Sequence, residues 1–266
     1  MIIIGEKLNG AIPSMAKAIA EKNEDYIRDL AKKQSDAGAN FLDVCASVAE
    51  DQELEVLKWL IDLVQGVTDT PICVDSPSAK VCAEAIRFCD KPGLVNSVSG
   101  EGEKIDTIFP VIAGTKWECI ALLSDDKGIP RTTERRIEVF QAIMKKAEEY
   151  KIPAGRLHID PLIEMLCASE DGIIRVTNTI KKVKELYPDI HVTGGASNIS
   201  FNLPARKYVN RAFIILAMNA GMDSAILDPL NKEMMGLIYA TEALLGNDDY
   251  CLGFIKAFRS GLFGNV

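Results

Sequence analysis

Short apolar runs with strand character alternate with longer amphipathic stretches along the whole chain. Within the longer stretches, apolar residues recur every three or four positions, as at Leu54, Leu57, Ile61 and Val64, and this spacing predicts helices. No Pro/Gly/Ser-rich linker interrupts the alternation, so the chain repeats one strand-then-helix unit. The eight predicted strands are Ile2–Ile4, Asn40–Val44, Pro71–Val74, Gly93–Val95, Glu118–Leu122, Leu157–Ile159, His191–Gly194 and Ser224–Leu227.

This alternation predicts a parallel sheet whose faces are covered by helices. Eight unbroken units favour an α/β fold made of one (β/α)8 TIM barrel, with a doubly wound open sheet as the alternative. The length of 266 residues suits such a barrel, so residues 1–266 are predicted to form a single domain. One helix is expected over Thr132–Tyr150, which opens with a Thr-Thr-Glu capping signature and whose many charges are typical of a solvated outer face. A last helix or tail is expected after Leu245.

Composition narrows the class of protein. Hydrophobic residues make up 48% of the chain and charged residues 26%, the mix of a soluble globular protein with a large core. The formal charge of −8 argues against a nucleic-acid partner. No run approaches the ~20 apolar residues of a membrane span, and the N-terminus turns polar too soon for a secretory signal. A cytoplasmic location without membrane contact is therefore expected.

Cysteine and histidine usage argues against a metal centre. The odd number of cysteines, without a CxxC pair or a secretory signal, indicates reduced thiols. His158 and His191 do not lie near a cysteine pair, so no bound metal is expected. The seven cysteines are Cys45, Cys73, Cys82, Cys89, Cys119, Cys167 and Cys251.

Carboxylate and carboxamide side chains stand where the apolar runs end. In a barrel these ends meet at the C-terminal face, which carries the active site. An Asp after a strand is alternatively the N-cap of the next helix, and this reading is equally good for Asp160 and Asp228, which both precede Pro. The sequences after Asp75, Asn96 and Asn198 do not begin a helix cleanly. The six strand-end residues are Asp43, Asp75, Asn96, Asp160, Asn198 and Asp228.

The opening of the predicted barrel at its C-terminal face, called the mouth below, is poor in nucleophiles and bases. His158 lies two residues before Asp160, on the same face of its strand but deeper, where a histidine is usually packed and hydrogen-bonded. The chain has no GxSxG, P-loop or HExxH motif. Gly194 and Gly195, just before Asn198, are predicted to make room for a flat ligand. A cavity lined by Asp and Asn suits a donor-rich heterocycle such as a 2-amino-4-oxo pteridine, whose amine and ring N–H pair with one carboxylate.

At these same residues the chain resembles the pterin-binding methyltransferases, which include methyltetrahydrofolate:corrinoid methyltransferases and the folate domain of cobalamin-dependent methionine synthase. The order and spacing of the shared motifs cover essentially the whole chain. Dihydropteroate synthases share the fold and the logic of the pterin site, but the SNISF loop fits the methyltransferases better. The motifs are GEKLN (Gly5–Asn9), CVDS (Cys73–Ser76), VNS (Val95–Ser97), DDKGIPRT (Asp125–Thr132), IDPL (Ile159–Leu162) and SNISFNLPAR (Ser197–Arg206).

The resemblance implies a pterin-binding barrel that moves a methyl group between N5 of tetrahydrofolate and the cobalt of a corrinoid protein. Tetrahydrofolate or 5-methyltetrahydrofolate would be the substrate, and a partner protein would carry the corrinoid (cobalamin). Asp75, Asn96 and Asp160 would hold the pterin ring, while Asn198 would approach N5 as the catalytic group. The remaining residues expected to border the site are Glu6, Gly195, Ser197 and Arg206.

Two positions depart from the branch of the family that serves the corrinoid/iron–sulfur protein. That branch resembles LDLNVG where this chain has LDVCAS, so Cys45 replaces an Asn. It also carries Gln where Phe201 stands, whereas the methionine-synthase branch has Phe. A corrinoid partner from an anaerobic demethylation system, taking methyl groups from methyl ethers or methylated amines, is therefore expected.

Two other functions remain open. A dihydropteroate synthase would need a Lys and Arg cluster at the mouth for pyrophosphate, and the late strand ends show none. A folate-binding or corrinoid-docking barrel without turnover is the second alternative, which the Asp and Asn set argues against. A homodimer is also expected, both from the resemblance and from the apolar stretch Met234–Leu245.

Overall fold

The computed structural model describes residues 1–169 and 171–263, which form eight strands and ten α-helices, with two α-helices after each of the first and last strands and one after each of the other strands. The strands are β1 (Ile2–Asn9), β2 (Phe41–Cys45), β3 (Ile72–Asp75), β4 (Leu94–Gly100), β5 (Glu118–Asp125), β6 (Leu157–Asp160), β7 (His191–Val192) and β8 (Ser224–Leu227). The helices are α1 (Pro13–Ala20), α2 (Glu24–Asp36), α3 (Glu50–Gln65), α4 (Ala79–Ala85), α5 (Lys104–Ile112), α6 (Thr133–Glu149), α7 (Gly172–Leu186), α8 (Arg206–Ala220), α9 (Lys232–Leu244) and α10 (Leu252–Arg259).

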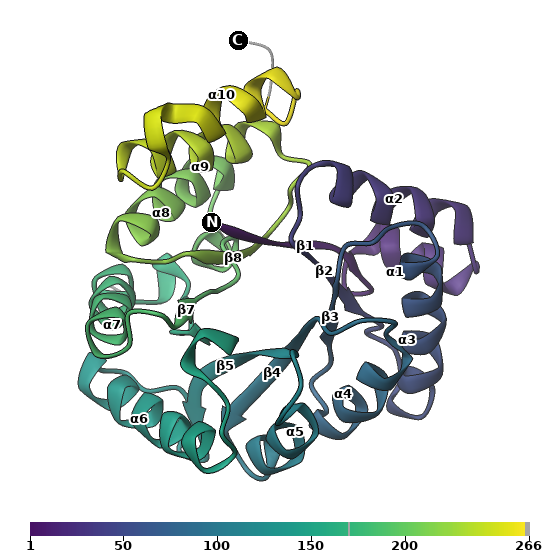
Figure 1. Ribbon diagram of the computed structural model, residues 1–266, viewed down its shortest axis with the longest axis horizontal. Coiled ribbons are helices and arrows are strands. Elements are labelled where there is room, and N and C mark those ends of the chain that lie inside the picture. The colour runs from purple at the N-terminus through teal and green to yellow at the C-terminus, as the bar shows by residue number, and fades with distance from the viewer. Residues whose placement is uncertain (170, 264–266) are drawn as a thin grey trace.

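The strands form one parallel sheet in the order β7-β6-β5-β4-β3-β2-β1-β8. Backbone hydrogen bonds then join its two ends: the Ile226 N–H donates to the Gly194 carbonyl over 3.1 Å, and the Ala196 N–H donates to the Ile226 carbonyl over 3.1 Å. Figure 1 shows the helices arranged around the outside of the strands. The predicted (β/α)8 TIM barrel is confirmed, and the doubly wound open sheet is wrong.

All eight predicted strands are present, but their ends differ from the prediction. β1 runs five residues beyond Ile4, and β4 runs on to Gly100, so Glu6 and Asn96 lie inside strands. β7 is shorter than predicted, because only His191 and Val192 pair regularly with β6. The polar residues of the mouth therefore come from the C-terminal parts of the strands as well as from the loops that follow them.

Side chains alternate along each strand and fill the barrel interior in layers. Ile4, Cys73, Leu94 and Ile120 form a fully buried apolar cluster inside the barrel. Two residues further along β1, β3 and β4, the same inward face presents Glu6, Asp75 and Asn96. Likewise Asp43 and Asp228 follow the interior residues Phe41 and Ile226 by two positions. The period of two thus places a polar layer directly above an apolar one.

Helix α6 shows both a confirmed and a corrected prediction. The Thr132 side chain accepts a hydrogen bond from the Arg135 N–H over 3.2 Å, so Thr132 is the N-cap that the sequence indicates. Val139, Phe140 and Ile143 bury the inner face of the helix. The outer face is charged as predicted, but Arg136 is an exception, because its side chain is fully buried.

The C-terminal helices lie together outside β8 (Figure 1). A helix after Leu245 is confirmed as α10. In α9, Met234, Met235 and Ile238 point into the core, so most of its apolar character serves the fold itself. None of the described helices combines the length and apolar character needed to cross a membrane.

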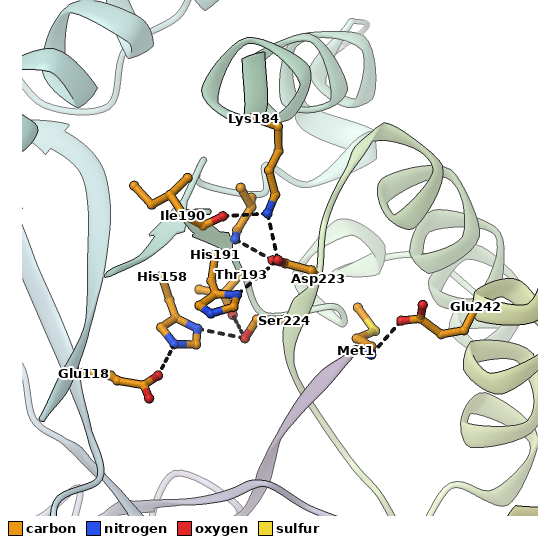
Figure 2. A network of polar contacts seen from close by, with 11 residues as sticks. Met1, Glu118, His158, Lys184, Ile190, His191, Thr193, Asp223, Ser224 and Glu242 are labelled. Atoms are coloured by element: carbon orange, nitrogen blue, oxygen red, sulfur yellow. Dashed lines mark hydrogen bonds and ion pairs between the residues drawn. The ribbon is translucent and has the colours of Figure 1, made fainter. Parts of the chain in front are cut away.

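The amino-terminal ends of β5 to β8 carry a hydrogen-bonded network, shown in Figure 2. His158 is fully buried, with Nε2 2.7 Å from Glu118 Oε2 and Nδ1 3.1 Å from Ser224 Oγ. His191 Nδ1 lies 3.0 Å from Asp223 Oδ2 in the same network. The prediction that His158 is packed and hydrogen-bonded in the interior is confirmed.

Candidate active site

On the inward faces of β2, β3 and β4, three polar side chains form one hydrogen-bonded group. Asn96 Nδ2 donates to Asp43 Oδ1 over 3.2 Å. Asp43 also shares a hydrogen bond with Asp75, which in turn contacts the Cys45 thiol. The sequence assigned the pterin to Asp75 and Asn96, and the structure links them through Asp43.

Two neighbouring buried carboxyls cannot both be charged at low cost. Burial, together with the nearby charge of Asp43, raises the pKa of Asp75 to about 8. Burial also raises the pKa of Asp43 to about 6, although hydrogen bonds from Cys73, Asn96 and Asp75 oppose the rise. Near neutral pH the pair therefore holds about one proton between its two carboxyls.

Glu6 brings a third carboxyl to the mouth from β1. Burial and repulsion from Asp228 raise the pKa of Glu6 to about 7, while Lys7 and Arg206 act in the opposite direction. Lys7 Nζ lies 3.6 Å from Asp228 Oδ2. The mouth thus concentrates acidic groups whose protonation changes close to neutral pH.

Asp160 is the buried last residue of β6, and it does not cap a helix. Its Oδ1 accepts the Leu162 N–H over 2.7 Å, which is a local turn, and α7 begins only at Gly172. Asp228 likewise accepts the Leu230 N–H over 2.9 Å, and the N-cap of α9 is a different residue, Asn231. The capping alternative is therefore wrong for both aspartates, and each remains available to the mouth.

Burial raises the pKa of Asp160 to about 6, and the Leu162 N–H and the charge of Arg136 limit the rise. Asp160 is therefore mainly ionised at neutral pH, unlike Asp75. An ionised carboxylate accepts hydrogen bonds, whereas a protonated one also donates, so the two aspartates offer a ligand different chemistry.

Asn198 lies on the loop between β7 and α8, at the start of a short 3-10 helix (Asn198–Ser200). Its N–H donates to the Gly195 carbonyl over 3.1 Å. A Cβ on Gly195 would lie 3.0 Å from Asn198 Nδ2 and 3.3 Å from its Oδ1. Gly195 therefore makes room for the Asn198 side chain, a more specific role than the space for a flat ligand that the sequence predicts.

Arg206 holds this loop together from the first turn of α8. Its Nε donates to Ser200 Oγ over 2.9 Å, and its Nη2 donates to the Ser197 carbonyl over 2.9 Å. The guanidinium also lies 4.7 Å from the centre of the exposed Phe201 ring. Among the described residues, no hydrogen bond joins this loop to the group formed by Asp43, Asp75 and Asn96.

A model of the pterin-binding enzymes matches residues 6–228 of the chain. The chain belongs to this family. A methylcorrinoid:tetrahydrofolate methyltransferase of Eubacterium limosum is 49% identical, over 100% of this chain and 99% of that protein. A methionine synthase of Mycobacterium leprae is 29% identical over 87% of this chain, which spans only 21% of that longer protein.

Among solved structures, a Yersinia pestis dihydropteroate synthase with a bound pterin–sulfa conjugate covers 92% of this chain and 94% of its own. Its TM-score is 0.69 and its sequence identity 18%, a likeness that shows the fold alone. The pterin-binding enzymes thus share this barrel at low sequence identity.

The sequence did not reveal the importance of two residues of this pterin-binding enzyme, Asp43 in the mouth and Arg136 behind it. Sequence reasoning noted Asp43 at a strand end but gave it no role, although its spacing of two from the interior residue Phe41 places it on the inward face. It read the charges of α6 as solvated and so overlooked Arg136. Neither the partner of Asp43 nor the burial of Arg136 is visible without the tertiary structure.

The described residues contain no group of three or more His, Cys, Asp or Glu side chains placed to hold a metal ion. All seven cysteines are free, and burial raises the pKa of the Cys45 thiol to about 12. Cys45 therefore remains a neutral thiol beside Asp75, acting as a hydrogen-bonding group of the mouth.

Proposed function

We propose that this pterin-binding enzyme is a methyltransferase that moves a methyl group from a methylated corrinoid protein to N5 of tetrahydrofolate. The observation that carries the proposal is the 49% identity, over the full length of both chains, to a protein named for that reaction. The mouth supports it, because its carboxyl and carboxamide groups match the hydrogen-bonding edge of a pterin.

In this proposal Asp160, Asp75 and Asn96 bind the pterin ring. The Leu162 N–H holds one Asp160 oxygen and so fixes the carboxylate, whose two oxygens can then accept the pterin amine and ring N–H. Asp75 is protonated at neutral pH and can donate to a ring acceptor. Glu6, Gly195, Ser197 and Arg206 border the site and the rest of the folate.

Asn198 is proposed to act at N5. The N5 lone pair attacks the methyl carbon as the carbon–cobalt bond breaks and its electron pair remains on cobalt. N5 gains positive charge as the bond forms and then releases its proton to solvent. A neutral carboxamide oxygen can accept the N5–H hydrogen bond as that charge develops, without itself titrating. The protein's remaining contribution is to orient the reactants and exclude water.

The partner and setting are also proposals. Cys45 and Phe201 distinguish the chain from the branch serving the corrinoid/iron–sulfur protein, which favours a corrinoid partner from an anaerobic demethylation system. The protein is proposed to act in the cytoplasm as a homodimer, without a nucleic-acid or membrane partner and without a metal of its own.

The test is to incubate the protein with methylcobalamin and tetrahydrofolate, and to follow the corrin spectrum and the formation of 5-methyltetrahydrofolate. We expect both signals to change together and in equal amounts. Tetrahydrofolate binding without methyl transfer, even with a methylated corrinoid protein, would indicate a docking barrel instead. Formation of a pteroate from a dihydropterin pyrophosphate and p-aminobenzoate would indicate a dihydropteroate synthase.

A further inference from the structure

Arg136 is a fully buried arginine in the first turn of α6, with 0% of its side chain exposed. Its Nε donates to the Pro130 carbonyl over 3.2 Å, and its Nη2 donates to Glu164 Oε2 over 3.0 Å. Pro130 belongs to the loop after β5, and Glu164 belongs to the loop after β6. One side chain therefore ties together two neighbouring loops at the C-terminal face of the barrel.

Glu164 is shared between two arginines. Arg175, from the first turn of α7, pairs with Glu164 and also with Asp171 Oδ1 at 2.7 Å. Burying a guanidinium is costly unless it is paired and hydrogen-bonded, and Arg136 shares its one carboxylate partner, Glu164, with Arg175. Among the described residues, Arg136 Nη1 has no hydrogen-bond partner. The charge of Arg136 is thus only partly neutralised by its own contacts.

Asp160 ends β6, four residues before Glu164, and the charge of Arg136 acts on its pKa. Burial favours the protonated form of Asp160, and Arg136 is one of two groups that favour the ionised form. The adjacent residues Leu122 on β5 and Thr193 after β7 are uncharged. Arg136 is therefore the cation whose charge acts to lower the pKa of this carboxyl.

Other charged groups surround the pair and must be separated in any test. Glu164 and Arg175 lie behind Arg136, on the loop after β6 and on α7. Across the mouth, burial also raises the pKa values of Glu6, Asp43 and Asp75 on β1 to β3, so they titrate in a similar pH range.

We propose that Arg136 is a positioning residue for methyl transfer, which is held between the loops after β5 and β6 and keeps Asp160 ionised so that it accepts the pterin donors. The proposal rests on the proposed function, because it requires a pterin at Asp160. Arg136 acts through Asp160 and need not touch the substrate.

The test compares Arg136→Met, which removes the charge, with Arg136→Lys, which keeps it. Arg135→Met is the matched control, because Arg135 is adjacent on α6 but pairs with Asp125 and Glu138 at the surface. Calorimetry would give the dissociation constant for tetrahydrofolate from pH 5.5 to 8.5, a range that brackets the pKa of about 6 of Asp160. Because Asp43, Asp75 and Glu6 are unchanged in every variant, the difference from wild type isolates the effect on Asp160.

Arg136→Met should move the acid midpoint of binding upward by about one pH unit, which means roughly tenfold weaker binding on the acid side of the wild-type profile. Arg136→Lys and Arg135→Met should keep the wild-type midpoint. A loss of affinity by the same factor at every pH, with the midpoint unmoved, would overturn the proposal and leave Arg136 a residue of the fold.

Glu164→Gln provides a variant with the opposite expectation, which also serves if Arg136→Met does not fold. It removes the anion beside Arg136, so the midpoint should move to lower pH; an unmoved or raised midpoint overturns the proposal. Failure of the wild-type protein to bind tetrahydrofolate would instead contradict the proposed function itself, so the two failures are distinguishable.

Discussion

At the scale of single residues, Asp160 and Asn198 have different surroundings, so replacing the first should mainly reduce ligand affinity and replacing the second should mainly reduce the rate. Asp160 is a buried carboxylate held by a backbone N–H, whereas Asn198 is a neutral amide on the loop after β7. Asp160→Ala should weaken tetrahydrofolate binding by roughly 2–4 kcal/mol, because the pterin donors lose a charged acceptor. Asn198→Ala should lower kcat on the order of 10²-fold while affinity falls less.

Dissociation constants and single-turnover rates for the two variants, measured side by side, check this prediction. Equal losses of affinity and rate in Asn198→Ala would make Asn198 a residue that shapes the loop. Wild-type affinity in Asp160→Ala would remove Asp160 from the pterin site.

A substitution at Gly195 can displace the Asn198 side chain without replacing it. An alanine Cβ there would lie 3.0 Å from Asn198 Nδ2, so Asn198 must move. Gly195→Ala should therefore slow methyl transfer roughly 10- to 100-fold, with little change in the melting temperature. Gly155→Ala is the matched control, because its Cβ would meet only the Asp189 carbonyl at an ordinary 3.4 Å. Unchanged turnover in Gly195→Ala would show that the position of Asn198 does not limit the rate.

In the ligand-free protein, Asp75 should make the free energy of unfolding fall as pH rises. Its pKa is about 8 in the folded state but about 4 when unfolded. Between these values the folded state binds more protons, so stability is lost as pH rises through this window. Asp75→Asn cannot ionise, and it should stabilise the protein at pH 8 by on the order of 1–3 kcal/mol, roughly 2–10 °C, and by less at pH 5. Equal differences in Tm at both pH values would contradict the raised pKa.

Much of the mouth is predictable from residue type and position. Asp75, Asn96 and Asp160 follow apolar runs, and strand alternation places them on the interior face. The shared proton of Asp43 and Asp75 is not predictable, because it depends on how closely β2 and β3 bring two carboxyls together. The burial of Arg136 is hidden for a similar reason: the charged residues around it in sequence, Glu134, Arg135 and Glu138, are exposed or half-buried.

At the scale of elements, the starts of β5, β6 and β8 are joined by His158, which pairs with Glu118 and Ser224. Burial lowers the pKa of His158, although Glu118 opposes the shift, so the folded state favours the neutral ring. The unfolded chain binds the proton near pH 6.5, so this residue should make stability fall as pH drops below that value.

His158→Gln should cost about 1–3 kcal/mol at pH 7, because Glu118 and Ser224 lose a buried partner. Glutamine does not titrate, so the difference in stability between wild type and variant should shrink from pH 7 to pH 5. Chemical denaturation at the two pH values measures both effects. A difference that grows at pH 5 would mean that the folded state prefers charged His158.

The ends of elements are less predictable than their existence. The apolar pattern of β1 stops near Ile4, where the interior becomes polar, yet backbone pairing with β2 continues to Asn9. Hydrogen bonds do not depend on whether the side chain faces an apolar core or a ligand site. A strand that reaches the mouth therefore continues past the end of its run of apolar residues in the sequence.

At the scale of the whole molecule, the first half of the apolar stretch Met234–Leu245 does not serve a dimer, because Met234, Met235 and Ile238 are in the core. Exposed apolar side chains lie in two places, on the C-terminal segment from Leu244 to Phe258 and beside α7 and α8, and those beside α7 and α8 also line a hollow. Tyr208 and Leu216 are 63% and 52% exposed, and they line one hollow with Leu166 and Ile173. Such a patch on a barrel surface is typical of a protein–protein contact.

We therefore expect a homodimer that uses this α7–α8 patch, and light scattering at micromolar concentration should return twice the mass of the chain. Leu216→Glu places a charge in the patch and should shift the protein toward monomers, since burying an unpaired carboxylate opposes association. Leu244→Glu is the matched control, because Leu244 is 86% exposed at the end of α9, away from the hollow. A monomer mass for the wild type would refute the dimer, whereas dissociation by Leu244→Glu alone would move the contact to the C-terminal helices.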